Sequence, residues 1–199
     1  MEGNQWYSVG LYCGRKRFIH GECLEDDISS EELGDMFYGV QKLRTPIRVR
    51  IQSGSKPGDF VFTTRVAVVL ISERVANLLK ENNITGWDTY DVAFFGKKGP
   101  IDGYFGLTVT GRIGPFKKDR VIVKKMPPRL PGAPEYYARF GMYLDESQWD
   151  GSDICTTKGG FSVFCDEKVK SLFEEHDITN ISLTRVEELQ DFEGGITIV

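Results

Sequence analysis

The chain has 199 residues, of which 27% are charged and 12% aromatic, a composition typical of an ordered globular protein rather than a disordered chain. Its formal net charge of −4 argues against general binding to nucleic-acid phosphates and is compatible with a basic protein partner. No apolar run has the length of a membrane-spanning helix and no apolar signal segment follows Met1, so we expect a cytoplasmic protein without a membrane partner.

The N-terminal region, residues 1–58, mixes predicted strands with one short helix. Residues 6–12 alternate enough to form a strand, and residues 15–19 can continue into its hairpin partner. Ser29 or Ser30 can cap a helix that runs through Phe37. Residues 47–51 alternate apolar and basic side chains, which predicts a strand with one apolar and one basic face.

The main organising feature is a helix–turn–strand unit that occurs twice, at residues 71–87 and 165–181. Ser72 and Asp166 each precede a helix and can cap it, and they lie 94 residues apart (166 − 72 = 94). The same spacing relates the predicted helix stops, Asn82-Asn83 and His176-Asp177, so the two copies align without a gap. We interpret this agreement as the result of internal duplication.

Each predicted helix carries an apolar stripe, and each is flanked by strand-like segments. The stripe residues are Val75, Leu78 and Leu79 in the first copy, and Val169, Leu172 and Phe173 in the second. Each copy is therefore β-α-β in outline. The fold class is predicted to be α+β, with mixed sheets, few helices and two related β-α-β halves.

The domain organisation follows from this repeat and from a cluster of prolines. We expect the first repeat half at residues 59–126 and the second at residues 136–199. Four prolines fall within residues 127–135, which excludes a helix or a central strand and predicts a connector between the halves. The whole chain is expected to form one compact unit.

The four cysteines stand at positions 13, 23, 155 and 165 and do not have the spacing of a zinc site. Buried, reduced thiols are the favoured state, and a disulfide between Cys13 and Cys23 or between Cys155 and Cys165 remains an alternative. No cofactor or metal is expected.

The most distinctive short string is Trp149-Asp150-Gly151-Ser152-Asp153. Its aspartates can cap the turn by accepting backbone N–H groups while Trp149 fills the core. They can equally hold a cation or accept from an Arg or Lys of a partner. Both interpretations stay open at this stage.

Charged residues cluster in two further places. An acidic stretch at residues 22–35 is either a solvated face or a surface for a cationic partner. A basic stretch at residues 112–129 is typical of an edge strand protected by lysines, and it lacks interleaved aromatic residues for stacking on bases. No nucleic-acid partner is therefore expected.

Three strings together carry a family resemblance: ISERV at 71–75 with TGW at 85–87, GYFGLTVTG at 103–111, and WDGSD at 149–153. Over about residues 60–189 the chain resembles immunity proteins of bacterial polymorphic-toxin systems, including the myxobacterial double-CxxCG-motif proteins. The CxxCG pair itself is absent, because the N-terminal part has only Cys13-Gly14 and an isolated Cys23.

This resemblance implies a non-enzymatic protein that binds and neutralises a cognate toxin domain. The partner-binding candidates are Trp149, Asp150, Asp153, Glu174, Glu175 and Asp177. The alternative is an orphan enzyme, or a protein that binds a small ligand or cation, with a site around Asp150 and Asp153. The chain has two histidines, His20 and His176, which makes a catalytic triad or a histidine metal site a poor prediction.

Overall fold

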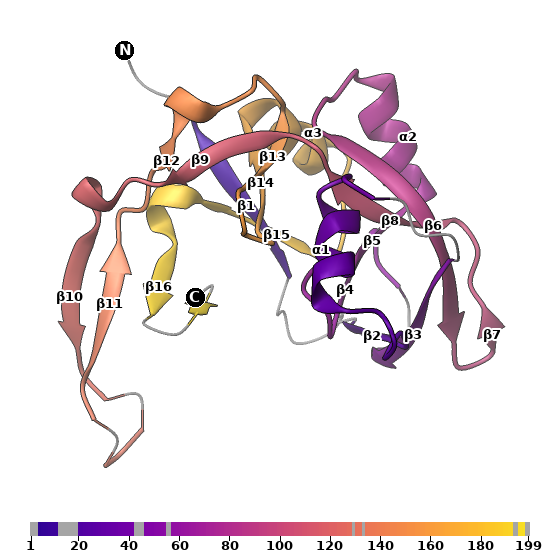
Figure 1. Ribbon diagram of the computed structural model, residues 1–199, viewed down its shortest axis with the longest axis horizontal. Coiled ribbons are helices and arrows are strands. Elements are labelled where there is room, and N and C mark those ends of the chain that lie inside the picture. Colours follow the sequence, from indigo (N-terminus) through magenta and orange to yellow (C-terminus); the bar gives the residue numbers. More distant parts are fainter. Residues whose placement is uncertain are drawn as a thin grey trace.

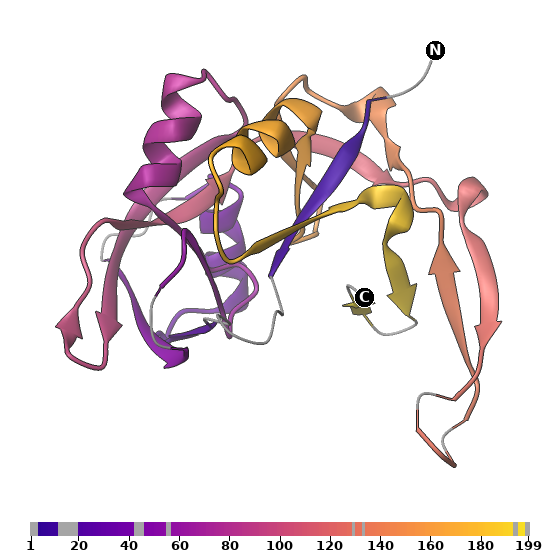
Figure 2. The same cartoon turned by 180° about the vertical axis from the view of Figure 1, so that it is seen from behind.

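The computed structural model describes residues 4–11, 20–41, 46–54, 57–128, 130–132, 134–192 and 195–197 (Figures 1 and 2). These residues form three α-helices and seventeen β-strands in three sheets. The protein is therefore α+β, with mixed sheets and few helices, as predicted. The longest helix among them has nine residues, less than half of what a membrane crossing needs.

The first sheet closes on itself. Its order is β3-β2-β4-β5-β8-β6-β7, and the pairing of β3 with β6 joins the two sides into a barrel. Its strands are β2 (His20–Cys23), β3 (Ile47–Ser53), β4 (Phe60–Thr63), β5 (Val69–Ser72), β6 (Trp87–Gly96), β7 (Gly99–Pro100) and β8 (Tyr104–Val109). Helix α1 (Ser30–Phe37) packs against β8 with four buried residues, Leu33, Gly34, Met36 and Phe37.

The second sheet is open and has the order β12-β9-β13-β14-β1-β15. Its strands are β1 (Trp6–Leu11), β9 (Arg112–Phe116), β12 (Leu144–Asp145), β13 (Ile154–Thr157), β14 (Val163–Asp166) and β15 (Ile181–Arg185). A third, smaller sheet contains β10 (Ile122–Met126), β11 (Tyr136–Phe140), β16 (Gln190–Phe192) and β17 (Gly195–Thr197). Short 3-10 turns occupy Lys118–Arg120, Glu146–Gln148 and Val186–Glu188.

The strand orders of the first two sheets correspond position by position. The order β3-β2-β4-β5-β8-β6 in one sheet matches β12-β9-β13-β14-β1-β15 in the other. Strands β4, β5 and β6 begin 94 residues before β13, β14 and β15, and helix α2 (Glu73–Glu81) begins 94 residues before α3 (Glu167–Glu175). Strands β2 and β4 pair in parallel, as do β9 and β13.

In each sheet, one inner strand comes from outside the β-α-β unit that it joins. The place between β5 and β6 is taken by β8, which follows β6, whereas the place between β14 and β15 is taken by β1. Tyr104 of β8 lies opposite Ser72, and Trp6 of β1 lies opposite the equivalent residue, Asp166. The two sheets are thus interlocked, because the N-terminal strand completes the sheet that the C-terminal residues build.

Helices α2 and α3 begin as the sequence predicts. The side chain of Ser72 accepts from the Val75 N–H at 3.3 Å, and that of Asp166 accepts from the Val169 N–H at 3.0 Å. Both side chains therefore cap the first turn of their helix, which satisfies one otherwise unpaired N–H.

Both helices also end in the predicted way. Asn83 and Asp177 have left-handed φ values of 51° and 47°, and the chain then folds back. The Ile84 N–H donates to the Leu79 carbonyl and the Ile178 N–H to the Phe173 carbonyl, each at 2.9 Å. The two stop signals have the same geometry because Asn and Asp tolerate the left-handed region.

Two further predictions concern single segments. Strand β1 pairs with β14 on one side and β15 on the other. The predicted hairpin partner, residues 15–19, lies outside the described residues, and β2 pairs with β3 and β4. The proline-rich segment 127–135 is the loop of the β10–β11 hairpin, since Met126 pairs with Tyr136.

Candidate functional site

The Trp149–Asp153 turn is held by contacts within the protein. The Asp150 carboxylate accepts from the backbone N–H groups of Arg112 at 2.8 Å and Ser152 at 3.0 Å. The Trp149 indole N–H donates to the Ser152 carbonyl at 2.9 Å, and its ring meets Trp6 edge-on at 5.3 Å. These contacts fit the interpretation of a turn whose aspartate caps backbone groups.

Asp153 joins the turn to the first half of the chain. Its Oδ2 accepts from both the backbone N–H and the hydroxyl of Thr85 at 2.7 Å, and its own N–H donates to the Thr85 hydroxyl at 3.1 Å. Lys168 Nζ lies 3.4 Å from the other carboxylate oxygen. Partial burial alone would raise the pKa of this carboxyl, but the hydrogen bonds from Thr85 and the Lys168 ammonium together hold it below its usual value.

Asp59 makes the same contacts, but here the first half supplies the aspartate and the second half the threonine. Its Oδ2 accepts from the N–H and hydroxyl of Thr179 at 3.0 and 2.8 Å, and its N–H donates to that hydroxyl at 2.9 Å. Arg74 lies 3.2 Å from the carboxylate, in the position that Lys168 takes beside Asp153. We call Asp59, Thr179 and Arg74 the first clasp, and Asp153, Thr85 and Lys168 the second clasp.

Each member of one clasp lies 94 residues from its equivalent in the other. Sequence reasoning singled out Asp153 but missed Asp59, Thr85 and Thr179. The repeat already placed Thr85 and Thr179 at equivalent positions, which was a signal for the two threonines. No local sequence pattern, however, shows which side chain each threonine contacts. The clasps explain why Asp153 is held so firmly, and they give it a role in joining the halves.

The other three candidates, Glu174, Glu175 and Asp177, lie together at the C-terminal end of α3, where all three are exposed. Lys170 Nζ lies 2.9 Å from the Glu174 carboxylate. Beside them is a hollow of about 320 Å³, which we call the acidic hollow. It is lined by Phe173, Glu174, Asp177, Ile178, Ile181 and Leu183.

An equivalent hollow lies beside α2, with a volume of about 510 Å³. Four of its lining residues are the 94-residue equivalents of residues in the acidic hollow: Lys80, Ile84, Trp87 and Thr89. Lys80 thus stands where the acidic hollow has Glu174. The two halves share the position of this hollow, but the charge at the helix end differs, although Glu73 and Asp88 also line the hollow beside α2.

The structure does not place the six partner-binding candidates in one site. Trp149, Asp150 and Asp153 belong to the turn, whereas Glu174, Glu175 and Asp177 form a separate acidic surface. Among the described residues, no three His, Cys, Asp or Glu side chains are placed to hold a metal ion. His20 contacts the Gln52 side chain at 3.1 Å, and the His176 carbonyl accepts from Arg74.

The described cysteines are buried and free: Cys23, Cys155 and Cys165. Burial raises the pKa of the thiols of Cys155 and Cys165, so both stay protonated at neutral pH. The prediction of reduced thiols is therefore confirmed for these three residues. The proposed pair of Cys13 with Cys23 involves a residue outside the described part of the chain.

The basic stretch at 112–129 is not a uniform cationic surface. The Arg112 guanidinium donates to the carbonyls of Val109, Gly111 and Tyr38, and it stacks 5.0 Å above the Tyr38 ring. Arg112 thus ties the β8–β9 bend to the end of α1, and the cations beyond it belong to the β10–β11 hairpin and its base.

No protein-family model matches the chain, and no curated protein matches it either.

Proposed function

We propose that this protein acts in the cytoplasm by binding another protein, and that the partner is a toxin domain, as in the immunity proteins that it resembles. The binding surface is the acidic hollow together with Glu175. Its apolar floor suits the aliphatic stem of a lysine or arginine, or an aromatic ring, and its carboxylates suit the cationic head.

The placement of the acidic residues carries this proposal. A helix has a partial negative charge at its C-terminus, where carboxylates are unfavourable by a few tenths of a kcal/mol to about 1 kcal/mol. Helix α3 nevertheless ends in Glu174 and Glu175, has no basic residue in its last turn, and is followed by Asp177. Lys170 offsets the charge of Glu174, and Glu81 ends α2 in the same way as Glu175 ends α3. The proposal is therefore supported by the clustering of Glu174, Glu175 and Asp177 beside an apolar hollow.

The alternative of an enzyme or cation site around Asp150 and Asp153 has no comparable support. Both carboxylates accept from backbone N–H groups, and Asp153 also has Lys168 beside it. A cation at this place would have to displace these donors, each of which stabilises the turn.

We also infer that the two halves arose by internal duplication. The shared strand order, the 94-residue spacing of the elements and the two equivalent clasps support this origin. On this view the scaffold was kept in both copies while the surface near α3 became acidic, which separates the residues that build the fold from those that bind.

The direct test is rescue of cells that express the C-terminal domain of a secreted toxin encoded beside this gene. We expect the protein to restore growth and to form a complex with that domain. Glu174→Lys with Glu175→Lys should abolish rescue, whereas Glu73→Lys with Glu81→Lys on α2 should not. If the α3 variant still rescues the cells and still binds, the acidic hollow is not the binding surface. If the protein forms no complex with the toxin domain, the proposed function is excluded.

A further inference from the structure

The β10–β11 hairpin extends away from the two main sheets (Figures 1 and 2). In its sheet, of order β10-β11-β16-β17, strand β10 lies at the edge, and among the described strands it pairs with β11 alone. Such an edge presents a row of unpaired N–H and C=O groups to solvent. The side chains of Ile122 and Val123 on this strand are 56% and 58% exposed.

This hairpin is not part of the architecture that the two halves share. It lies between β9 and β12, and the corresponding place between β2 and β3 holds helix α1, whose apolar residues are fully buried. The hairpin instead leaves apolar side chains in solvent, with Tyr137 at 53% and Leu130 at 70% exposure. Exposed apolar residues gathered on one element indicate a contact surface.

The charge of the hairpin is opposite to that of the protein as a whole. Residues 117–140 carry seven basic and two acidic side chains, whereas the whole chain has a net charge of −4. Lys124 and Lys125 are both exposed and, as neighbours on a strand, point to opposite faces. Lys124 lies 5.3 Å from the Phe140 ring, and Lys125 pairs with Glu135.

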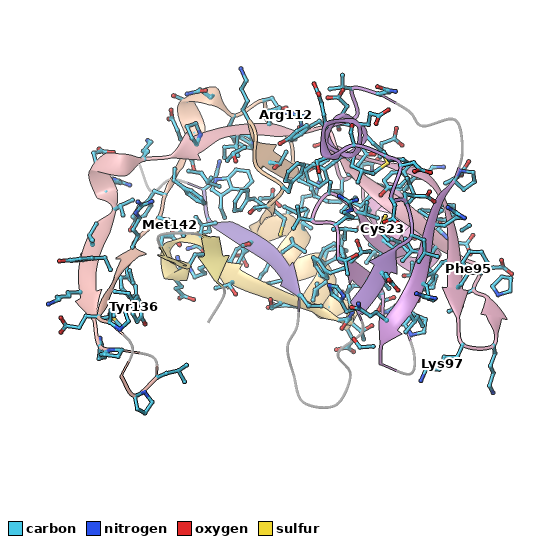
Figure 3. The ribbon with its side chains drawn as sticks, turned by 60° about the horizontal axis from the view of Figure 1, so that its bottom comes forward. Cys23, Phe95, Lys97, Arg112, Tyr136 and Met142 are labelled. Atoms are coloured by element: carbon cyan, nitrogen blue, oxygen red, sulfur yellow. The ribbon has the colours of Figure 1, made fainter. Side chains whose placement is uncertain are left out.

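A hollow of about 240 Å³ continues this surface at the base of the hairpin. Lys117 and Arg120 line it together with Glu146 and Glu187, so its charges balance, and Trp6 and Met142 line it from the body of the protein. Figure 3 shows Met142 at this base, with Tyr136 further out on the hairpin. A segment lying along β10 would thus have two lysines along its length and a charge-balanced hollow at one end.

We propose that the edge of β10 binds an extended acidic segment of another protein, which adds to the sheet as a further strand. Backbone pairing supplies affinity in this mode, and side-chain pockets and charges supply specificity. Carboxylates of the segment face Lys124 on one face of the added strand and Lys125 on the other. This surface is separate from the acidic hollow, so the inference does not depend on the proposed function.

A second copy of this chain is a poorer occupant of the same edge. Antiparallel pairing of β10 with its own counterpart, centred on Lys124 or Lys125, would place a lysine opposite a lysine, which is destabilising. Pairing centred on Val123 avoids these pairs but still sets two basic hairpins side by side. Charge complementarity therefore selects an acidic strand from a different protein.

The test uses the full chain and a fluorescein-labelled peptide in which single valines separate pairs of glutamates, so that an added strand has carboxylates on both faces. Binding is titrated by fluorescence anisotropy. We expect saturable binding that Lys124→Glu with Lys125→Glu weakens by about tenfold or more. The matched control is Lys97→Glu with Lys98→Glu, which makes the same charge change on exposed lysines of the β6–β7 turn, at the opposite end of the molecule (Figure 3). This control should change the affinity by less than about twofold.

Backbone pairing is tested with a peptide of the same charge in which the central valine is replaced by proline. Proline cannot donate to a strand ladder, so its binding should also be weaker by about tenfold or more. Equal binding of the proline peptide, or insensitivity to the change at Lys124 and Lys125, would overturn the proposal. Tighter binding of a single-stranded oligonucleotide of equal charge, or no saturable peptide binding up to about 1 mM, would do the same.

Discussion

At the scale of single residues, the charge of Asp153 has a structural use, since it accepts three polar hydrogens, two of them across the joint between the halves. Two come from Thr85 and one from Lys168. Charge-assisted hydrogen bonds are stronger than neutral ones, and leaving their donors without an acceptor adds a desolvation penalty. The second clasp should therefore contribute measurably to stability.

We predict that Asp153→Asn lowers the free energy of unfolding by about 1–2 kcal/mol at neutral pH. The folded-state pKa of Asp153 lies below its unfolded value of about 3.9, so its charge stabilises the fold above that pH. The contribution is lost as the pH falls through the folded pKa, and the two proteins should then converge. Urea denaturation between neutral pH and about pH 3 measures this. Asp119→Asn, on an exposed 3-10 turn, should show neither effect, and a constant difference across this range would contradict the assignment.

A second residue-scale prediction concerns the last residue of α3. Replacing Glu175 by lysine should raise the free energy of unfolding by about 0.5 kcal/mol, because a cation is favourable at a helix C-terminus. Glu81 is the last residue of α2 and lies 94 residues earlier, so Glu81→Lys should give a similar gain. Only Glu175→Lys should also weaken binding to the toxin domain. Destabilisation by Glu175→Lys, measured by urea denaturation, would mean that Glu175 supports the fold.

At the scale of elements, the turn between α2 and β6 must let β13 come very close. Gly86 has a φ of 87°, and a Cβ built on it would lie 1.9 Å from the Ile154 carbonyl oxygen. The equivalent residue in the other half, Asn180, has room for a side chain, which donates to the Phe60 carbonyl at 2.7 Å. The two joints thus share a backbone path, but only the one at Gly86 excludes a side chain.

We predict that Gly86→Ala lowers the free energy of unfolding by about 3 kcal/mol or more. This sums a left-handed backbone penalty of about 1–2 kcal/mol and the cost of the clash with β13. Gly159 has a similar φ of 76° but open space around its Cβ position, so Gly159→Ala should cost only the backbone part. Equal losses for both variants in thermal or urea denaturation would show that β13 moves aside freely.

The local signals in the sequence predicted the elements well, because caps, apolar stripes and stops act within one or two turns. The α2 and α3 helices begin after Ser72 and Asp166 as expected, and β1 and β3 lie where alternation placed them. Strand partners were not predictable in this way, since an alternating pattern says which face is buried and not which strand lies alongside. The same limit applies to the site: the turn at Asp153 was visible, but its partner Thr85 lies 68 residues away.

At the scale of the whole molecule, the inner strand of each sheet comes from outside the β-α-β unit that it joins. Strand β1 contributes Tyr7 and Val9 to the core between β14 and β15, and β8 contributes Leu107 and Val109 between β5 and β6. If β1 and β8 are the first strands of two duplicated units, the units have exchanged them. Such an exchange makes the second sheet dependent on the N-terminal strand, and the barrel dependent on the strand that follows its own β-α-β unit.

We predict that a chain divided between Lys97 and Lys98, in the exposed turn after β6, yields two fragments that fold only together. Residues 1–97 lack β8, and residues 98–199 lack β1, so each sheet would lose an inner strand and its hydrogen bonds on both sides. Each fragment alone should show the narrow amide chemical-shift range of an unfolded chain, and an equimolar mixture should regain dispersed signals in a 1:1 complex. The comparison fragment, residues 20–111, has nearly the same length as 1–97 but contains every strand of the barrel, and it should retain structure by itself. If residues 1–97 fold as a stable monomer, or if 20–111 is no better ordered than 1–97, then β8 is not the strand on which the first half depends.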